Sequence, residues 1–93
     1  MAEYLLELSV SRGDTRAVAS GAERGRAAAE ELTEEGTPVR YMRAIFVPED
    51  ETCFFLYEAG SVEPVREAAR RAGLGSERVT EALGARKGEE ACL

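Results

Sequence analysis

The segment spanning residues 52–82 constrains the fold of this chain more than any other. It reads TCFFLYEAGSVEPVREAARRAGLGSERVTEA, so an aromatic-rich apolar run, a serine, an amphipathic run and a glycine follow in close succession. Apolar runs of this length favour strands, and a serine ahead of apolar residues spaced by three and four favours a helix start. The segment therefore predicts a strand over residues 52–58, a helix between Ser61 and Gly73, and a weaker strand over residues 76–83.

Two further strands are predicted, over residues 3–10 and 39–47, because apolar residues dominate both runs. A turn over residues 48–50, with the sequence Pro-Glu-Asp, follows the second of these strands. A turn this short joins neighbouring antiparallel strands, so residues 39–47 and 52–58 are predicted to form a hairpin.

A long helix is predicted over residues 15–35, with Asp14 or the threonine after it as N-cap and Gly36 just past the end. Its apolar stripe is unusually small, because it includes Gly21 and Gly25. Each glycine costs about 1 kcal/mol relative to alanine inside a helix. We interpret the two glycines as a sign of close packing on a sheet. The alternative is a helix that frays or breaks between them.

The predicted order is β-α-β-β-α-β, which defines a ferredoxin-like α+β fold. In this fold, two helices pack on one face of a four-stranded antiparallel sheet. The chain has 93 residues, enough for one domain, which we place at residues 1–83. The polar residues 84–93 are predicted to form a flexible tail.

Composition excludes several classes of function. The formal net charge is −6, with 18 acidic and 12 basic residues, which disfavours binding to nucleic acid or anionic membranes. No apolar run reaches the roughly 18 residues of a membrane span, and the N-terminus lacks the basic start of a signal peptide. The chain has two cysteines, Cys53 and Cys92, for which we expect no disulfide. We therefore expect a cytoplasmic protein.

The sequence contains no histidine, so the commonest general base and transition-metal ligand is missing. It also has no Cys-x-x-Cys, phosphate-binding loop or dinucleotide motif. We therefore favour a non-enzymatic module. The alternative is a small cofactor-free isomerase or monooxygenase in a dimer cavity, with Glu7 as base and Tyr41 or Tyr57 as proton donor.

Strand alternation suggests which side chains lie on the sheet face that the helices leave open. We place Tyr4, Leu6, Leu8, Met42, Ala44, Phe46, Phe54 and Leu56 against the helices. The predicted open face then comprises Leu5, Glu7, Tyr41, Arg43, Ile45, Cys53, Phe55 and Tyr57. A mixed apolar and charged patch of this kind usually marks an interface, so we expect a homodimer through this face.

Within that interface, Glu7 and Arg43 could pair with each other or contact a small-molecule ligand. Tyr41 and Tyr57 could supply hydroxyl groups to the same ligand. These four residues form the predicted ligand-binding site. The chain is therefore expected to be a dimeric ligand-binding or regulatory module with a cavity on its open sheet face.

Several short segments also carry a family resemblance. They are the opening strand EYLLEL, Tyr41, Tyr57-Glu58-Ala59, Ser61, Val65-Arg66-Glu67, Ala72-Gly73-Leu74 and Arg78-Val79. Their order over residues 3–83 resembles a family of small bacterial domains of unknown function that includes nickel-binding proteins. The resemblance implies a ferredoxin-like fold, dimerisation and a divalent metal such as nickel as cofactor.

The chain departs from that family at two positions. Members commonly have a histidine where this chain has Ala68, and often a cysteine where it has Phe55. Imidazole and thiolate suit nickel better than carboxylates do. A metal would therefore have to use the weaker candidates Glu7, Cys53 and Glu58.

Overall fold

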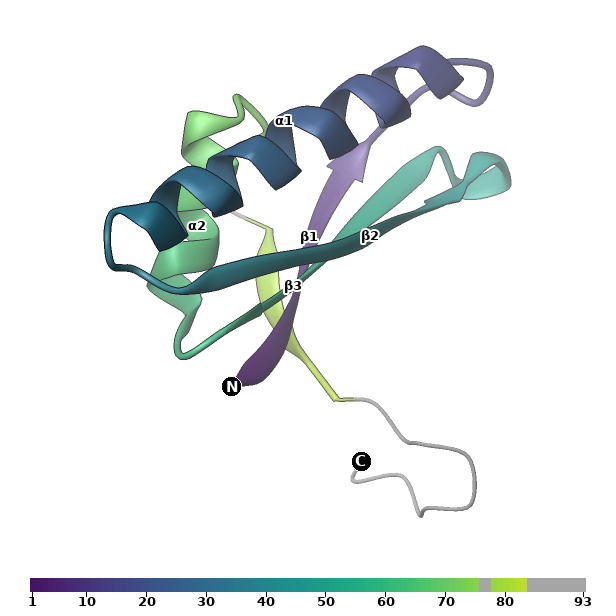
Figure 1. The fold of residues 1–93 in the computed structure, drawn as a ribbon. Helices are drawn as coiled ribbons and strands as arrows, with labels where there is room; N and C mark the ends of the chain where they lie inside the picture. Colours follow the sequence, from purple (N-terminus) through teal and green to yellow (C-terminus); the bar gives the residue numbers. More distant parts are fainter. Residues whose placement is uncertain (76–77, 84–93) are drawn as a thin grey trace.

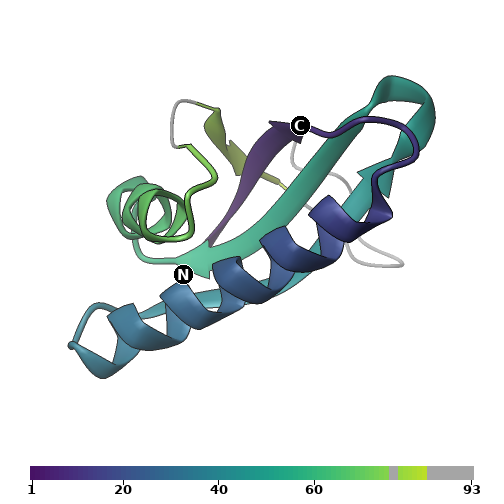
Figure 2. The same ribbon diagram turned by 90° about the horizontal axis from the view of Figure 1, so that it is seen from above.

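The computed structural model describes residues 1–75 and 78–83; the predicted tail at residues 84–93 lies outside them. The elements are β1 (Ala2–Ser9), α1 (Thr15–Glu34), β2 (Val39–Val47), η1 (Pro48–Asp50), β3 (Thr52–Ala59), α2 (Val62–Arg71) and β4 (Val79–Ala82). The strands form one antiparallel sheet in the order β2-β3-β1-β4 (Figure 1). In the view from above, α1 passes in front of the strands and α2 is seen end-on beside them (Figure 2). The predicted ferredoxin-like fold is confirmed.

The helix α1 runs unbroken through both of its central glycines, so the alternative of a broken helix is wrong. The Asp14 carboxylate accepts a hydrogen bond from the backbone N–H of Ala17 at 3.1 Å, which confirms Asp14 as the N-cap. Gly36 follows the helix with φ of 98°, a conformation that favours glycine. Within the part of the chain that the structure describes, no helix is long and apolar enough to span a membrane.

The two glycines of α1 let the helix approach the sheet closely. A Cβ atom on Gly21 would lie 3.0 Å from Cζ of Phe55, and one on Gly25 would lie 2.7 Å from the hydroxyl oxygen of Tyr57. Ordinary carbon contacts are near 3.5–4.0 Å, so neither position has room for a side chain. The prediction of close packing is therefore confirmed, and aromatic rings from β3 fill the space beneath α1.

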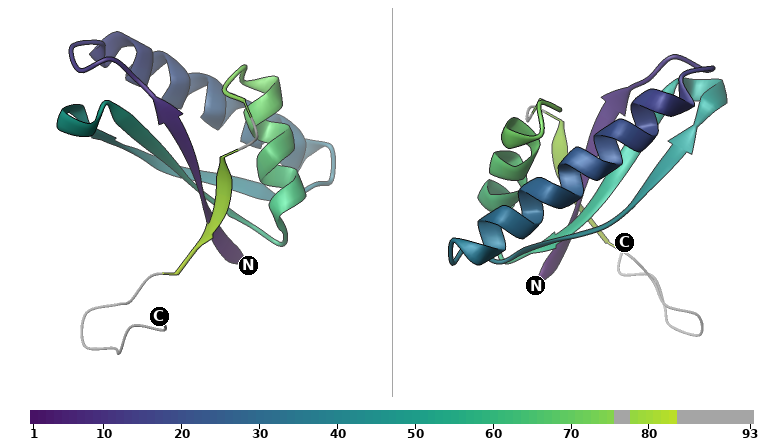
Figure 3. Two further views of the ribbon diagram at one scale, coloured as in Figure 1. Left: turned by 180° about the vertical axis from the view of Figure 1, so that it is seen from behind. Right: turned by 45° about the horizontal axis from the view of Figure 1, so that its top comes forward.

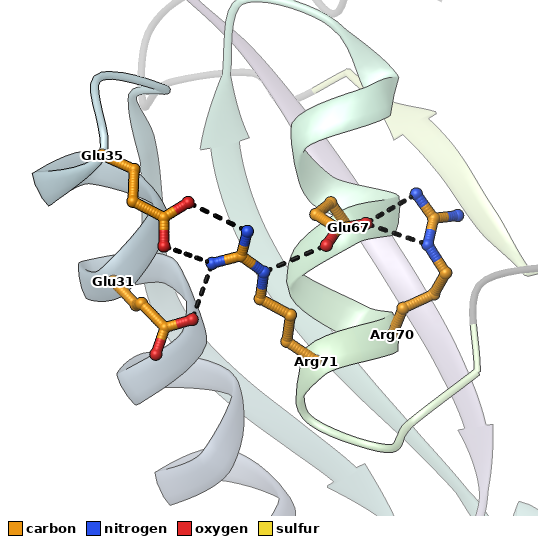
Figure 4. A network of polar contacts seen from close by, with 5 residues as sticks. All are labelled: Glu31, Glu35, Glu67, Arg70 and Arg71. Carbon is orange, nitrogen blue, oxygen red and sulfur yellow. Dashed lines mark hydrogen bonds and ion pairs between the residues drawn. The ribbon is translucent and has the colours of Figure 1, made fainter.

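The second helix, α2, is attached to the end of α1 by ion pairs (Figure 4). The Arg71 guanidinium donates to Glu31 at 2.6 Å, to Glu35 at 2.8 and 2.9 Å, and to Glu67 on its own helix at 3.0 Å. Arg24 of α1 also donates to the backbone carbonyl of Ala72 at 2.5 Å, where α2 ends. These contacts link the two helices through polar side chains that the apolar pattern of the sequence does not reveal.

The prediction for β3 was wrong about which face is buried. Cys53, Phe55 and Tyr57 are completely buried against the helices, while Phe54 and Leu56 lie on the open face. Both faces of this strand carry large apolar residues, so alternation alone could not separate them. The parity of the polar residues at the strand ends did indicate the open face, because Thr52 and Glu58 share a face with Phe54 and Leu56.

The prediction of which face each residue of β2 occupies was correct only for residues 43–46, beyond the middle of the strand. A register shift between Tyr41 and Arg43 marks a β-bulge at Met42, so two residues of β2 oppose Leu56 of β3. The bulge turns Tyr41 toward the helices, against the prediction, and leaves Met42 exposed. Beyond it, Arg43 and Ile45 lie on the open face, as predicted.

Candidate functional site: the open face of the sheet

The open face of the sheet has an apolar centre. Leu5 of β1 lies opposite Leu56 of β3, and Phe54 of β3 lies opposite Ile45 of β2. All four are partly or largely exposed, with Ile45 retaining 40% of its accessible surface. In Figure 3, α1 lies behind the strands in the left-hand view and crosses in front of them in the right-hand view. No described element covers this apolar centre.

Charged side chains surround the apolar centre in a regular way. The acids Glu3, Glu7 and Glu58 lie on the central strands β1 and β3, whereas Arg40 and Arg43 lie on the edge strand β2. Two of these acids are paired: Arg78, just before β4, donates to Glu7 at 2.6 Å, and Arg40 lies 3.6 Å from Glu58. The open face is therefore acidic along its middle and basic along its edges.

The four residues of the predicted ligand site do not come together. Glu7 and Arg43 lie on the open face, whereas Tyr41 and Tyr57 lie on the helix face. Glu7 pairs with Arg78 rather than with Arg43. In the part of the chain that the structure describes, Arg43 forms no ion pair.

Beneath α1, the fully buried Tyr57 packs against the partly buried Tyr41. Their ring centroids are 5.5 Å apart, and the planes meet at 75° in an edge-to-face arrangement. The hydroxyl of Tyr57 is buried and has no hydrogen-bond partner among residues 1–75 and 78–83. Burial raises the pKa of both Tyr41 and Tyr57 above the usual value. Neither can serve Glu7 as a proton donor, because the sheet separates them from it.

Cys53 is a core residue. Its side chain is fully buried and carries a free thiol. Burial raises the pKa of this thiol, which keeps it protonated near neutral pH. Cys53 therefore packs as a small apolar side chain beside the other residues of β3.

The candidate metal ligands do not fit a nickel site within one chain. Cys53 lies on the helix face, whereas Glu7 and Glu58 lie on the open face. Glu58 is opposite Glu3, which is four residues, or about 13 Å, from Glu7 along β1. Within residues 1–75 and 78–83 there is no cluster of three or more histidine, cysteine, aspartate or glutamate residues able to hold a metal ion.

The sequence analysis did not assign some residues to the open face that the structure places there. Phe54 and Leu56 form half of the apolar centre, and the parity of Thr52 and Glu58 was the signal that could have found them. Arg78, the partner of Glu7, is 71 residues away in sequence, so only the pairing of β1 with β4 brings the two together.

Fold and site together define a small ferredoxin-like α+β protein with an uncovered, partly apolar sheet face. The model of a family described as "Nickel responsive protein SCO4226-like" matches residues 4–82. The chain therefore belongs to the SCO4226-like family.

A solved structure supports the same fold. The crystal structure of SCO4226 from Streptomyces coelicolor A3(2) is similar over 90% of this chain and 100% of that one, with a TM-score of 0.73 and 20% sequence identity. A comparison with curated proteins finds no match.

Proposed function

We propose that this protein is a non-enzymatic binding module that works as a homodimer, with the open sheet face as its interface. The observation that carries the proposal is the uncovered apolar centre formed by Leu5, Ile45, Phe54 and Leu56. Burying such side chains contributes about 25 cal/mol for each Å² removed from water. A small domain with a modest core gains most from covering a patch of this kind.

The arrangement of charge favours a second copy as the occupant of this face. Acids lie along the middle and arginines along the edges, so a copy whose strands cross those of the first at a steep angle can place its arginines near the acids of the first. A twofold interface uses the same patch twice, and this patch carries both signs of charge. Two sheets packed face to face lie about 10 Å apart, which leaves room for side chains from both.

Glu7 and Arg43 remain the residues through which the dimer would contact a ligand. Both lie on the open face next to the apolar centre, and a dimer contributes each of them twice. Their charges suit a small polar molecule held between the two sheets. The hydroxyls of Tyr41 and Tyr57 take no part in this version of the site.

The test is the mass of the protein in solution. Sedimentation equilibrium is expected to show a dimer for the natural chain and a folded monomer for Ile45→Asp, because a carboxylate opposite Phe54 would be buried in the apolar centre of the interface. The matched control is Ala19→Asp, an exposed position on α1, which should remain dimeric. A natural chain that is monomeric at high micromolar concentration would exclude the proposal.

A nickel-responsive role is the second candidate, and family membership supports it. Because the chain has no histidine and Cys53 is buried, the metal would have to bind carboxylates such as Glu3 and Glu58, which lie opposite each other. Calorimetric titration with Ni²⁺ tests this directly. Saturable binding that Glu58→Gln weakens would support the role, and the absence of any saturable heat would exclude carboxylate binding of nickel.

A further inference from the structure

A groove separates α1 from the edge strand β2, on a different side of the molecule from the open sheet face. It has a volume of about 530 Å³ and lies between α1 and residues 39–41 of β2. On the α1 side it is lined by Arg26, Ala29, Glu30, Thr33 and Glu34, so the helix rim of the groove carries two acids and one arginine. Its floor is apolar, because Ala29, Val39 and the ring of Tyr41 contribute to it. Beside the groove, α1 lies close to the ring of Tyr41, because a Cβ atom on Gly25 would lie 3.8 Å from Cδ1 of Tyr41.

One side of the groove is the backbone edge of β2 that does not pair with β3. The Thr33 hydroxyl donates to the carbonyl of Val39 at 2.9 Å and accepts from its N–H at 3.2 Å, so both polar groups of Val39 face α1 rather than β3. Along an edge strand, alternate residues direct both groups to the same side. The N–H and C=O of Tyr41, two residues further on, therefore also face away from β3 and border the groove.

We propose that this groove binds an extended peptide segment of a partner protein, which adds to the edge of β2 at Tyr41. A groove between a helix and an edge strand is the arrangement that proteins use for strand addition, in which backbone hydrogen bonds supply affinity and pockets select alternate side chains. The peptide residue opposite Tyr41 would place an apolar side chain on the floor beside Ala29. Its two neighbours would point to the other side of the sheet.

The charges on β2 indicate which residue types the peptide should have on either side of its apolar residue. Arg40 and Arg43 lie on the open-face side of β2, on either side of Tyr41, and Arg40 is 71% exposed with one pairing distance of 3.6 Å. Opposite charges on facing strands stabilise a pair, and like charges destabilise it. The favoured peptide therefore has an apolar residue flanked by acids.

A second copy of the chain fits this edge poorly. Pairing two β2 strands would bring four arginines, Arg40 and Arg43 of each chain, onto one short ribbon. The bulge at Met42 also interrupts regular pairing along the edge, which is a common protection against strand-to-strand association. The bulge limits the added strand to a short segment centred on Tyr41.

The experiment uses the natural chain labelled with ¹⁵N and the capped peptide acetyl-TELET-amide. Titration is expected to give saturable chemical-shift changes at Tyr41 and Ala29. Methylating the backbone nitrogen of the peptide leucine, which removes one hydrogen bond, should weaken binding roughly tenfold. The lysine peptide acetyl-TKLKT-amide should bind more weakly than the acidic one.

A charge-swap variant supplies the control, because a reversed peptide preference cannot result from misfolding of the protein. Arg40→Glu, at an exposed position, should reverse the preference so that the lysine peptide binds better, while Arg16→Glu on the exposed start of α1 should leave it unchanged. Absence of saturable shifts at millimolar peptide, shifts confined to the open sheet face, or insensitivity to backbone methylation would each overturn the proposal. So would a change of oligomeric state in Arg40→Glu without any change in peptide preference.

Discussion

At the scale of single residues, the contact between Gly25 and Tyr57 decides how close α1 can lie to the sheet. The Tyr57 hydroxyl occupies the position that a side chain on residue 25 would need. Gly25→Ala gains about 1 kcal/mol of helix propensity, but it forces overpacking that costs about 1–3 kcal/mol. We expect a net loss of about 1 kcal/mol in the free energy of unfolding, measured by urea denaturation.

The same contact supplies the control for that experiment. In the double variant Gly25→Ala with Tyr57→Phe, the obstructing oxygen is absent, so the alanine should no longer destabilise the protein and should show its helix propensity instead. Gly13→Ala, in the turn before α1, where no atom lies within 4 Å of the added Cβ, reports the effect of a glycine-to-alanine change that makes no new contact. Equal losses in the single and double variants would show that the hydroxyl is not the obstacle.

Tyr57→Phe by itself should maintain or raise stability. The hydroxyl is buried without a hydrogen-bond partner in the described residues, and burying an unsatisfied polar group costs about 1–3 kcal/mol. Removing it should therefore increase the free energy of unfolding, in contrast to the usual cost of changing a core residue. A loss above about 1 kcal/mol in thermal or urea unfolding would mean that the hydroxyl has a partner in solution, such as an ordered water.

At the scale of elements, Arg71 joins α2 to the end of α1 through ion pairs. Its hydrogen bonds lower the pKa of Glu35 and Glu67 below the ordinary value of 4.5. A carboxyl group with a lowered folded-state pKa contributes stability above its unfolded pKa, and that stability is lost as pH falls through the folded-state value.

Replacing Arg71 should therefore change how stability depends on pH. Arg71→Gln is expected to lower the midpoint of thermal unfolding near neutral pH. Below about pH 4.5 the difference from the natural chain should shrink, because the glutamates become protonated in both proteins. Circular dichroism across this pH range makes the comparison, with Arg16→Gln as control. A difference that stays constant down to strongly acidic pH would mean that Arg71 acts through packing alone.

The elements also show what the sequence could and could not predict. Spacing, caps and glycines were enough to place both helices and the three long strands within a residue or two. The faces of β1 followed from alternation, because Glu3 and Glu7 oppose its apolar side. The faces of β3 did not, since both are apolar, and the bulge at Met42 depends on pairing with β3 rather than on any local signal. The prediction for the ligand site was affected in the same way. Glu7 and Arg43 do lie on the open face, whereas Tyr57 lies on the other face of β3 and Tyr41 lies before the bulge, on the helix face.

At the scale of the whole molecule, the proposed dimer should respond to salt. If acids along the middle of one sheet face arginines at the edges of the other, added salt will screen the attraction. Sedimentation equilibrium is expected to show a weaker dimer when NaCl rises from about 0.05 M to about 0.5 M. Combining Arg43→Gln with Glu7→Gln should reduce this dependence, because it neutralises one arginine and one acid of the open face in each copy. A dimer that strengthens with salt would point to an interface held by apolar contacts alone.

The close contact that Gly21 and Gly25 allow between α1 and β3 limits how the sequences of this family can vary. The helix supplies hollows at Gly21 and Gly25, and β3 supplies the rings of Phe55 and Tyr57 that fill them. A larger residue in the helix is tolerable only where the ring beneath it has become smaller. Among relatives, positions 21 and 55 should therefore change together, as should positions 25 and 57, so that the volume between helix and strand is conserved while the residues that provide it exchange places.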